Sequence, residues 1–166
     1  MNIYLEQATP GDIRRISELG QRIWRAHYPD IIGTEQTEYM LGLLYSYDGL
    51  QRQIEEGQVF YLVMEGDAAI GFLAVSNRGE GQYFLNKFYL DNEKRGRGLG
   101  KVVFELLLAR CPGLRELRLT VNRQNYKSIN FYFKAGFTIE CCVNIPIGEG
   151  YVMDDFQMVY TVDGRR

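Results

Sequence analysis

Three glycines stand between a stretch typical of a β-strand and a stretch typical of an α-helix, and this junction constrains the fold more than any other feature. Gln82–Leu90 (QYFLNKFYL) is rich in the aromatic residues that strands favour. The run after Gly100 is apolar at helical spacing to about Arg110. Glu116–Val121 (ELRLTV) then has the pattern of another strand. A strand, a loop, a helix and a strand in this order predict a right-handed crossover.

The loop itself, Glu93–Lys101 (EKRGRGLGK), combines glycines with cations. Glycine has no side chain, so backbone N–H groups can approach an anion closely, and the first N–H groups of a helix lack internal partners. The loop therefore suits a diphosphate without a metal. It matches neither GxxxxGK[ST] nor GxGxxG, because Gly96, Gly98 and Gly100 alternate with single residues. A solvated surface turn is the alternative interpretation.

The other segments predict one domain over residues 1–166, with a core at about 3–162. We expect an α+β, or mixed α/β, fold with one central sheet and helices on its faces. Further strands are expected at 3–8, 58–65, 68–76, 138–146 and 151–162, and further helices at 12–28, at 34–56 with a break near 47–49, and at 125–135.

Charge and composition argue against several classes of protein. Lys and Arg number 19 and Asp and Glu 21, so the net charge of −2 disfavours general nucleic-acid binding. Three cysteines without CxxC spacing and a single histidine predict no metal site. The chain starts without a signal-like segment and has no apolar run of ~18 residues. We expect no membrane segment and a cytoplasmic location.

The stretch LTVNRQNYKSINFYFKAGF (residues 119–137) predicts a helix with two faces. One face could present polar side chains to a cleft, while the other packs on the sheet. Equally, its first residue could be only a helix cap and its tyrosine only a core residue. The polar face carries Asn125, Ser128 and Tyr132, and the apolar face carries Tyr126, Ile129 and Phe133.

Together, the glycine loop and this stretch resemble the GNAT superfamily of acetyl-CoA-dependent N-acetyltransferases. The superfamily pattern is a strand ending in Val-Asn, an Asn three residues on, then Phe-Tyr and Gly-Phe. Val121-Asn122, Asn125, Phe131-Tyr132 and Gly136-Phe137 stand in those places. The resemblance covers about residues 3–162. It implies a mostly antiparallel sheet of six or seven strands, with a splayed parallel pair and helices on both faces.

The resemblance also implies acetyl-CoA as cosubstrate and a role for individual residues. The loop would hold the diphosphate, the backbone of the preceding strand would bind the pantetheine arm, and Tyr132 would be the general acid. Homodimers are common among relatives, so a homodimer is possible. The residues implied in binding the coenzyme are Phe88, Leu90, Arg95, Gly96, Arg97, Gly98, Leu99, Gly100, Lys101, Asn122, Asn125, Ser128 and Tyr132.

The general base is not assigned, because the strand Gln82–Leu90 contains none of the carboxylates that many relatives use there. His27 is a candidate, with solvent as the alternative. Aromatic and acidic side chains elsewhere predict a pocket for a cationic acceptor. The candidates for its walls are Trp24, His27, Tyr28, Glu35, Glu38, Tyr39, Tyr45, Tyr151, Asp154 and Asp155.

The acceptor itself is the least constrained prediction. Gly148–Met158 (GEGYVMDDFQM) resembles the ends of polyamine or diamine acetyltransferases, although Asp154-Asp155 could equally be a solvated hairpin turn. We expect acetyl transfer to a primary amine, such as a polyamine or diamine, by direct attack in a ternary complex. The alternatives are a protein N-terminus or lysine as acceptor, and a non-catalytic acyl-CoA-binding regulatory module.

Overall fold

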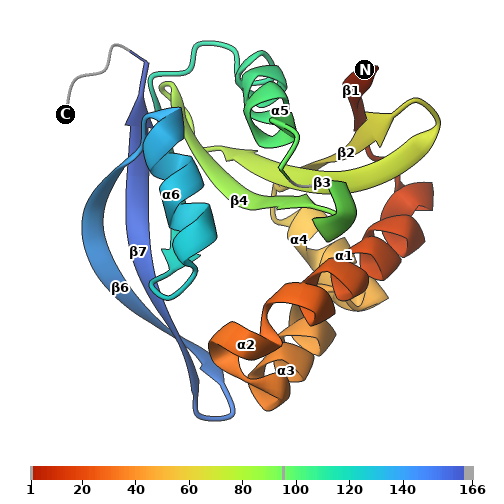
Figure 1. The fold of residues 1–166 in the computed structure, drawn as a ribbon, viewed down its shortest axis with the longest axis vertical. Coiled ribbons are helices and arrows are strands. Elements are labelled where there is room, and N and C mark those ends of the chain that lie inside the picture. The colour runs from red at the N-terminus through yellow and green to blue at the C-terminus, as the bar shows by residue number, and fades with distance from the viewer. Residues whose placement is uncertain (1, 95, 163–166) are drawn as a thin grey trace.

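Seven strands form one sheet in the computed structural model, which describes residues 2–94 and 96–162 (Figure 1). Their order across the sheet is β1-β2-β3-β4-β5-β7-β6, and all neighbours are antiparallel except the parallel pair β4 and β5. The expected α+β class and the parallel pair are confirmed. The strands are β1 (Ile3–Gln7), β2 (Val59–Glu65), β3 (Ala68–Asn77), β4 (Gln82–Leu90), β5 (Glu116–Asn122), β6 (Thr138–Gly148) and β7 (Tyr151–Thr161).

The helices occupy the connections that the sequence predicts. The expected break in the second helical region falls at Ser46, whose side chain caps the next helix by accepting a hydrogen bond from Gly49 N. Pro29 follows the end of the first helix and begins a short one. The helices are α1 (Ile13–His27), α2 (Pro29–Ile32), α3 (Thr34–Leu44), α4 (Tyr47–Glu55), α5 (Leu99–Leu108) and α6 (Tyr126–Ala135), with 3-10 turns at Pro10–Asp12 and Asn92–Lys94.

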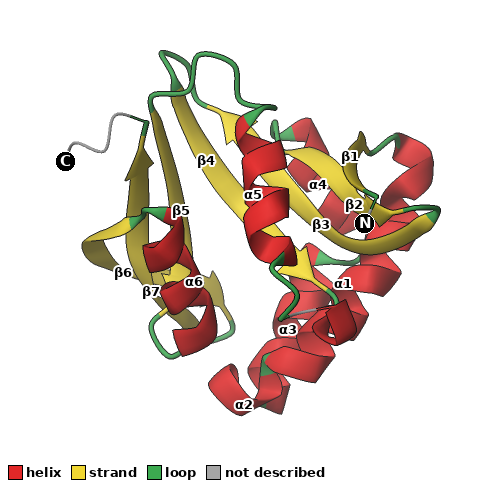
Figure 2. Cartoon of the chain, turned by 45° about the horizontal axis from the view of Figure 1, so that its top comes forward, coloured by secondary structure: helices red, strands yellow, loops and turns green. Residues whose placement is uncertain are grey.

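The sheet separates two hydrophobic cores, because successive side chains of a strand point to opposite faces. On β2, Phe60 and Leu62 pack with α1, α3 and α4, whereas Tyr61 and Val63 pack on the side of α5 and α6. Figure 2 shows α5 and α6 in front of the sheet and α1, α3 and α4 at its other face. The central sheet is therefore held between two layers of helices.

An extra residue in β4 reverses which face its side chains point to. Ala74 of β3 pairs with Lys87, but the next residue, Val75, pairs with Leu85, which leaves Asn86 as a β-bulge. Leu85 packs on the α5 side, whereas Lys87, two residues on, contacts rings on the α1–α4 side. A strand with unbroken alternation would have sent both side chains to the same face.

β4 and β5 are paired only at their beginnings. The parallel register joins Gln82–Phe84 to Glu116–Arg118 and ends there. β5 continues instead alongside β7, up to the pair of Asn122 with Asp155. The second half of β4 and the second half of β5 thus leave a space between them, which forms the site.

The expected apolar face of α6 is wrong. Ile129 is buried as predicted, but Tyr126 is 68% exposed and Phe133 is 46% exposed. The other buried side chain of α6 is Tyr132, and Phe131 packs against the same core. The helix sits at the end of the space between β4 and β5, so the face that periodicity assigns to the sheet is partly left to solvent.

Candidate functional site

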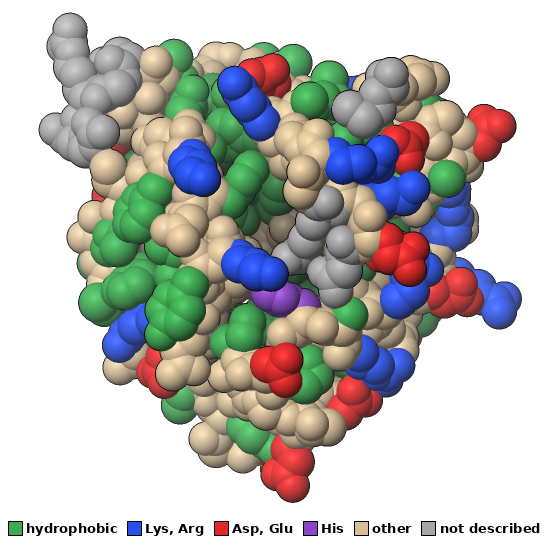
Figure 3. All heavy atoms as spheres, viewed as in Figure 1, with side chains coloured by type: hydrophobic (Ala, Val, Ile, Leu, Met, Phe, Trp, Pro, Cys, Tyr) green, Lys and Arg blue, Asp and Glu red, His purple; other side chains and the backbone are tan. Residues whose placement is uncertain are grey.

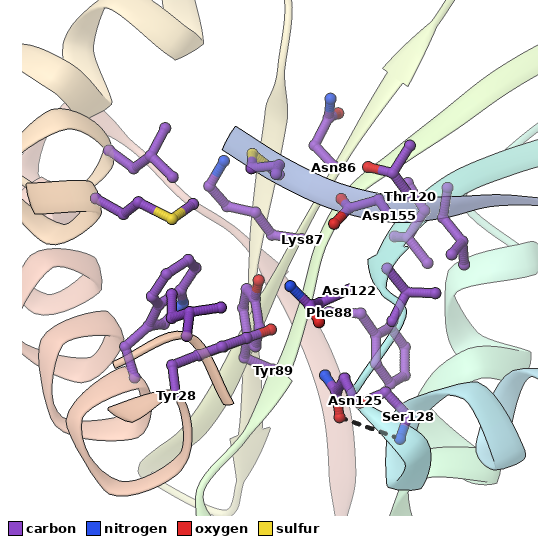
Figure 4. A pocket seen from close by; sticks show the side chains of 18 of the residues that line it. Tyr28, Asn86, Lys87, Phe88, Tyr89, Thr120, Asn122, Asn125, Ser128 and Asp155 are labelled. Carbon is purple, nitrogen blue, oxygen red and sulfur yellow. Dashed lines mark hydrogen bonds between the residues drawn. The ribbon is translucent and has the colours of Figure 1, made fainter. Parts of the chain in front are cut away.

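A cavity of about 120 Å³ occupies the space between the separated ends of β4 and β5 (Figure 4). We call it the central cavity. Its walls are residues 85–89 of β4, residues 119–122 of β5, Asn125, Ser128 and Tyr132 around α6, Met153 and Asp155 of β7, and side chains of α1–α3 with Tyr45. Figure 3 shows a hollow near the centre of this face, with the side chain of the single histidine at its rim.

The N-terminus of α6 is joined to the end of α1. Asn125 caps α6, because its Oδ1 accepts a hydrogen bond from Ser128 N at 3.4 Å. The same Oδ1 lies 3.3 Å from His27 Nε2. An oxygen that caps a helix can only accept, so the Nε2 of His27 is the donor and carries a hydrogen. Asn125 is therefore both a helix cap and a wall of the central cavity, which unites the two interpretations of the sequence.

Tyr132 lies where the cavity meets the core on the α5 side. It is only 8% exposed, and its ring packs edge-on against Phe88 and Phe137, with centroid distances of 6.5 and 5.4 Å. These rings hold the phenol on the cavity wall. Ser128 and Asn125, from the same polar face of α6, line the cavity beside it. The structure thus brings together the three side chains that the helical wheel placed on one face.

Asp155 is a buried carboxyl group on the opposite wall, 2% exposed, in the middle of β7 between Asn122 and Val143. Burial raises the pKa of Asp155 to about 6, and a hydrogen bond from Thr120 opposes the rise. Asp154, its neighbour, is exposed, as strand alternation requires. The two acids are therefore strand residues with different surroundings, and Asp155 alone lines the cavity.

Aromatic side chains form the wall on the α1 side. The rings of Trp24 and Tyr28 pack in a tilted arrangement with centroids 4.2 Å apart, and Trp24 meets Tyr45 and Tyr89 edge-on at 5.6 and 6.0 Å. All four line the cavity. Tyr89 was missed by the sequence analysis, because its direction depends on the bulge at Asn86. A narrow space between rings and a carboxyl group suits an alkylammonium ion.

Four other acceptor candidates lie outside the cavity lining. Glu35 is exposed, and Glu38 forms a salt bridge with Arg25 at 2.8 Å. Tyr39 packs against Tyr151 in a tilted arrangement with centroids 5.1 Å apart and donates a hydrogen bond to Ile147 O at 2.6 Å. These two tyrosines hold the β6–β7 hairpin against α3. Tyr39 and Tyr151 therefore support the surroundings of the central cavity without lining it.

The glycine loop lies before α5, and its backbone suits an anion. Gly96 and Gly98 have φ of 81° and 72°, in the left-handed region, and a Cβ at either would meet open space. Gly98 caps α5 without any side-chain hydrogen bond. Gly100 differs, since a Cβ there would lie 2.7 Å from Phe131 Cε1. The absence of its side chain lets α5 pack against α6.

Charged side chains flank this loop. Lys94 and Arg97 both contact Glu65, at 3.2 and 3.3 Å, and the contact with Lys94 is the main reason why the pKa of Glu65 is lowered. Lys101 follows in the first turn of α5. Arg95, which the sequence analysis also assigned to the loop, lies outside the described residues. Leu99 is buried in the core, so any contact of Leu99 with an anion would come from its backbone.

The space between the strands also leaves backbone groups available. β4 pairs with β3 on one edge, but on its other edge the pairing with β5 ends at Phe84. The edge of β4 from residue 85 to residue 90 therefore faces the gap rather than a strand. Such an edge can pair with an extended amide-containing chain, as pantetheine is. Phe88 and Leu90 lie on this segment.

The described residues contain neither a cluster that could hold a metal ion nor a helix that could cross a membrane. No group of three or more His, Cys, Asp or Glu side chains in residues 2–94 and 96–162 is placed to hold a metal ion. Within the same residues, no helix is long and apolar enough to cross a membrane.

Comparison with known proteins adds a family and several relatives. A sequence model described as the acetyltransferase (GNAT) family matches residues 16–137. Spermidine N(1)-acetyltransferase of Thermoplasma acidophilum is 28% identical over 151 residues, which are 84% of this chain and 91% of that protein. Peptidyl-lysine N-acetyltransferase YjaB of Escherichia coli is 34% identical over 86 residues, about half of each chain (52% and 53%). Among solved structures, the PaiA N-acetyltransferase of T. acidophilum in complex with coenzyme A has a TM-score of 0.78 at 24% identity, with 97% of this chain and 99% of that one covered.

Proposed function

The chain belongs to the acetyltransferase (GNAT) family, and on this basis we propose that it transfers the acetyl group of acetyl-CoA to a slender aliphatic primary amine, such as a polyamine or diamine. The family match confirms the enzyme class and the acetyl-CoA donor expected from the sequence. The acceptor is the proposed part. The observation that carries it is the buried carboxyl group of Asp155 in a cavity of only about 120 Å³.

The size and lining of the central cavity favour this acceptor class. Trp24, Tyr28, Tyr45 and Tyr89 all line this small cavity, and a slender alkyl chain would match its volume and its aromatic lining better than a bulky multi-ring amine would. A cation is attracted both to the faces of such rings and to the carboxylate of Asp155. The similarity to a spermidine acetyltransferase over 84% of the chain points to the same class.

The donor would lie across the gap between β4 and β5. We place its diphosphate at the backbone of Gly96–Gly100 and the N-terminus of α5, with Lys94, Arg97 and Lys101 nearby. The pantetheine arm would pair with the free edge of β4 around Phe88 and Leu90. Asn122, Asn125 and Ser128 would line its far end. This arrangement brings the thioester to the wall that holds Tyr132.

The proposed reaction is a direct attack. The neutral acceptor nitrogen bonds to the thioester carbon, and the carbonyl oxygen becomes an oxyanion that a backbone N–H near Phe88 would stabilise. The C–S bond then breaks, and the sulfur leaves as a thiolate. The attacking nitrogen becomes positively charged when its bond to carbon forms, so it must lose one proton. Tyr132 would donate its phenolic proton, or a hydrogen bond, to the leaving sulfur, and the proton lost from the nitrogen would balance the one that the sulfur gains. The products are the N-acetyl amine and coenzyme A.

Release of free thiol from acetyl-CoA with a panel of amines tests this proposal. The panel contains spermidine, putrescine, an aminoglycoside, amino acids and a lysine-containing peptide. We expect turnover with the slender alkylamines, and Tyr132→Phe should lower kcat about 100-fold while the KM for acetyl-CoA stays the same. Turnover with the peptide alone would assign a protein acceptor, the activity named for YjaB. Tight acetyl-CoA binding without turnover would favour a regulatory module.

A further inference from the structure

Lys87 is the one basic side chain that lines the central cavity among the described residues. It stands directly after the bulged residue Asn86, in the part of β4 that no longer pairs with β5. Its side chain is 6% exposed. Figure 4 shows it leaving β4 on the same side as Tyr89, across the cavity from Asn122 and Asn125. Because of the bulge, this amine lies on the acceptor side of the sheet.

The Lys87 amine is held by two neutral amides. Its Nζ donates to Oε1 of Gln53 and to Oε1 of Gln58, the latter at 3.1 Å. Gln53 cannot present its other amide end, because its Nε2 already donates to Leu44 O and Gly49 O at 2.7 and 2.9 Å. The hydrogen bonds of Gln53 therefore fix this partner of Nζ as an acceptor, and Gln58 also presents its Oε1 to Nζ.

The side-chain carbon and the two donated hydrogen bonds occupy three of the four tetrahedral positions around Lys87 Nζ, so one position remains. An ammonium ion would place a third N–H there, and a neutral amine would place its lone pair there, so either form keeps both amide partners. The rings of Tyr45 and Phe60 lie 6.0 and 5.5 Å from Nζ. No described carboxylate forms a salt bridge with Lys87. Burial accordingly lowers the pKa of Lys87 to about 7.

The groups that face Lys87 from the neighbouring elements do not restore its charge. Tyr45 and Tyr89 are phenols whose pKa burial raises well above the usual value, so they stay neutral. Tyr28, which follows α1, and Asp155 of β7 line the same cavity as Lys87. A cationic acceptor bound at Asp155 would further disfavour an ammonium ion at Lys87.

We propose that the Lys87 amine is the general base that accepts the proton from the acceptor ammonium group, directly or through one water molecule. The proton moves from R–NH₃⁺ to the Lys87 nitrogen, and the lone pair left on the acceptor then attacks the thioester. Lys87 returns the proton to solvent before the next turnover. This role rests on the proposed function. It fills the position for which β4, with no Asp or Glu, offers no carboxylate.

Other candidate bases fit less well. His27 does not line the cavity, and its Nε2 donates to Asn125. Asp155 is the group that would bind the acceptor cation, and a base that keeps this ion pair would have to be a different residue. An amine that titrates near neutral pH is suited to proton transfer, because both of its protonation states are populated during turnover.

The pH dependence of kcat/KM for the acceptor tests this role. In the wild-type enzyme we expect the value to rise up to about pH 7 and then to level off. Lys87→Met should lower it about 100-fold at pH 7. Above pH 7, the loss of kcat/KM in Lys87→Met relative to the wild-type enzyme should shrink about tenfold per pH unit. The reason is that the acceptor amine increasingly loses its proton in solution as the pH approaches the pKa of that amine. A purely structural role predicts parallel profiles, and parallel profiles would overturn the proposal.

Gln58 offers a matched pair of variants in which Lys87 is intact. Gln58→Glu places a carboxylate beside Nζ and should move the acidic limb upward by about one pH unit. Gln58→Met removes the same contact without adding charge and should not move it upward. If the acidic limb of the kcat/KM profile stays at its wild-type pH in both Gln58 variants, Lys87 is rejected as the base. This test holds even if Lys87→Met fails to fold. No turnover in the wild-type enzyme with any amine would instead overturn the proposed function itself.

Discussion

His27 Nε2 lies 3.3 Å from Asn125 Oδ1, and this contact joins two residues 98 positions apart in the sequence. It connects the last residue of α1 to the cap of α6, on either side of the central cavity. The end of α1 and the helix that carries Tyr132 are thus tied together at one point.

The first prediction concerns this contact. Asn125→Ala removes the helix cap and the partner of His27, and should lower the free energy of unfolding by about 1 kcal/mol. Asn125→Asp keeps an acceptor oxygen and should cost less. His27→Ala should cost about 0.5–1.5 kcal/mol. Urea unfolding measures all three.

The double variant His27→Ala, Asn125→Ala provides the control. Both single changes remove the same hydrogen bond, so the double variant should cost less than the sum of the two. Strict additivity would show that the contact contributes nothing to stability.

Asp155 and Asp154 form a matched pair for substrate binding. Asp155→Asn removes the carboxylate of the central cavity and should raise the KM for a polyamine at least about tenfold, while the KM for acetyl-CoA stays the same. Asp154→Asn changes an exposed side chain and should alter neither value by more than about twofold. Steady-state kinetics with both substrates varied measures the effects. Equal effects of Asp155→Asn on both substrates would contradict acceptor binding at this residue.

Asp155 and Lys87 predict opposite slopes of stability against pH. The pKa of Asp155 is raised from 3.8 to about 6, so the folded protein binds more protons than the unfolded chain between these values. Its contribution to stability therefore falls as the pH rises from about 4 to 6, by at most about 1.4 kcal/mol per unit. The pKa of Lys87 is lowered from 10.5 to about 7, so the unfolded chain binds more protons in that window. Its contribution rises from pH 7 to 10.

Urea unfolding at several pH values separates the two contributions. Asp155→Asn should flatten the acidic slope and leave the basic one, and Lys87→Met should do the reverse. Lys87→Met removes a buried amine that is partly charged near pH 7, but it also leaves Oε1 of the buried Gln53 without its donor, so the slope of stability against pH, rather than the stability at one pH, measures the shift. If neither variant changes the dependence of unfolding free energy on pH, the pKa shifts of both Asp155 and Lys87 are contradicted.

Gly98 and Gly100 should respond differently to the same substitution. Gly100→Ala places a Cβ 2.7 Å from Phe131 Cε1 and should cost about 1–3 kcal/mol of stability through overpacking. Phe131→Leu in the same chain should recover part of that loss. Gly98→Ala meets no neighbour and should cost about 1 kcal/mol through its left-handed φ of 72°. Gly98→Asn should cost less than Gly98→Ala, since Asn tolerates this conformation better. Thermal unfolding distinguishes the two mechanisms.

The local parts of this protein were readable from its sequence. The order of strands and helices, the cap at Asn125, the stop at Gly136 and the glycine loop before α5 each depend on neighbouring residues, and the structure has all of them. The family pattern around Asn122, Asn125 and Tyr132 lies within one strand-and-helix unit, so it too was visible. Short-range propensity and spacing suffice for such features.

The lining of the central cavity on the α1 side was decided by tertiary structure. The bulge at Asn86 arises from the pairing of β4 with β3, and no periodicity in β4 predicts that Lys87 and Tyr89 turn toward α1–α4. Asp154 and Asp155 look equivalent in sequence, and only the alignment of β7 with β5 buries one and exposes the other. The amides of Gln53 and Gln58 reach Lys87 from 34 and 29 positions away. These features depend on contacts between distant segments. The sequence by itself therefore determined the family and the glycine loop before a helix, whereas the lining of the central cavity was decided only when the sheet was assembled.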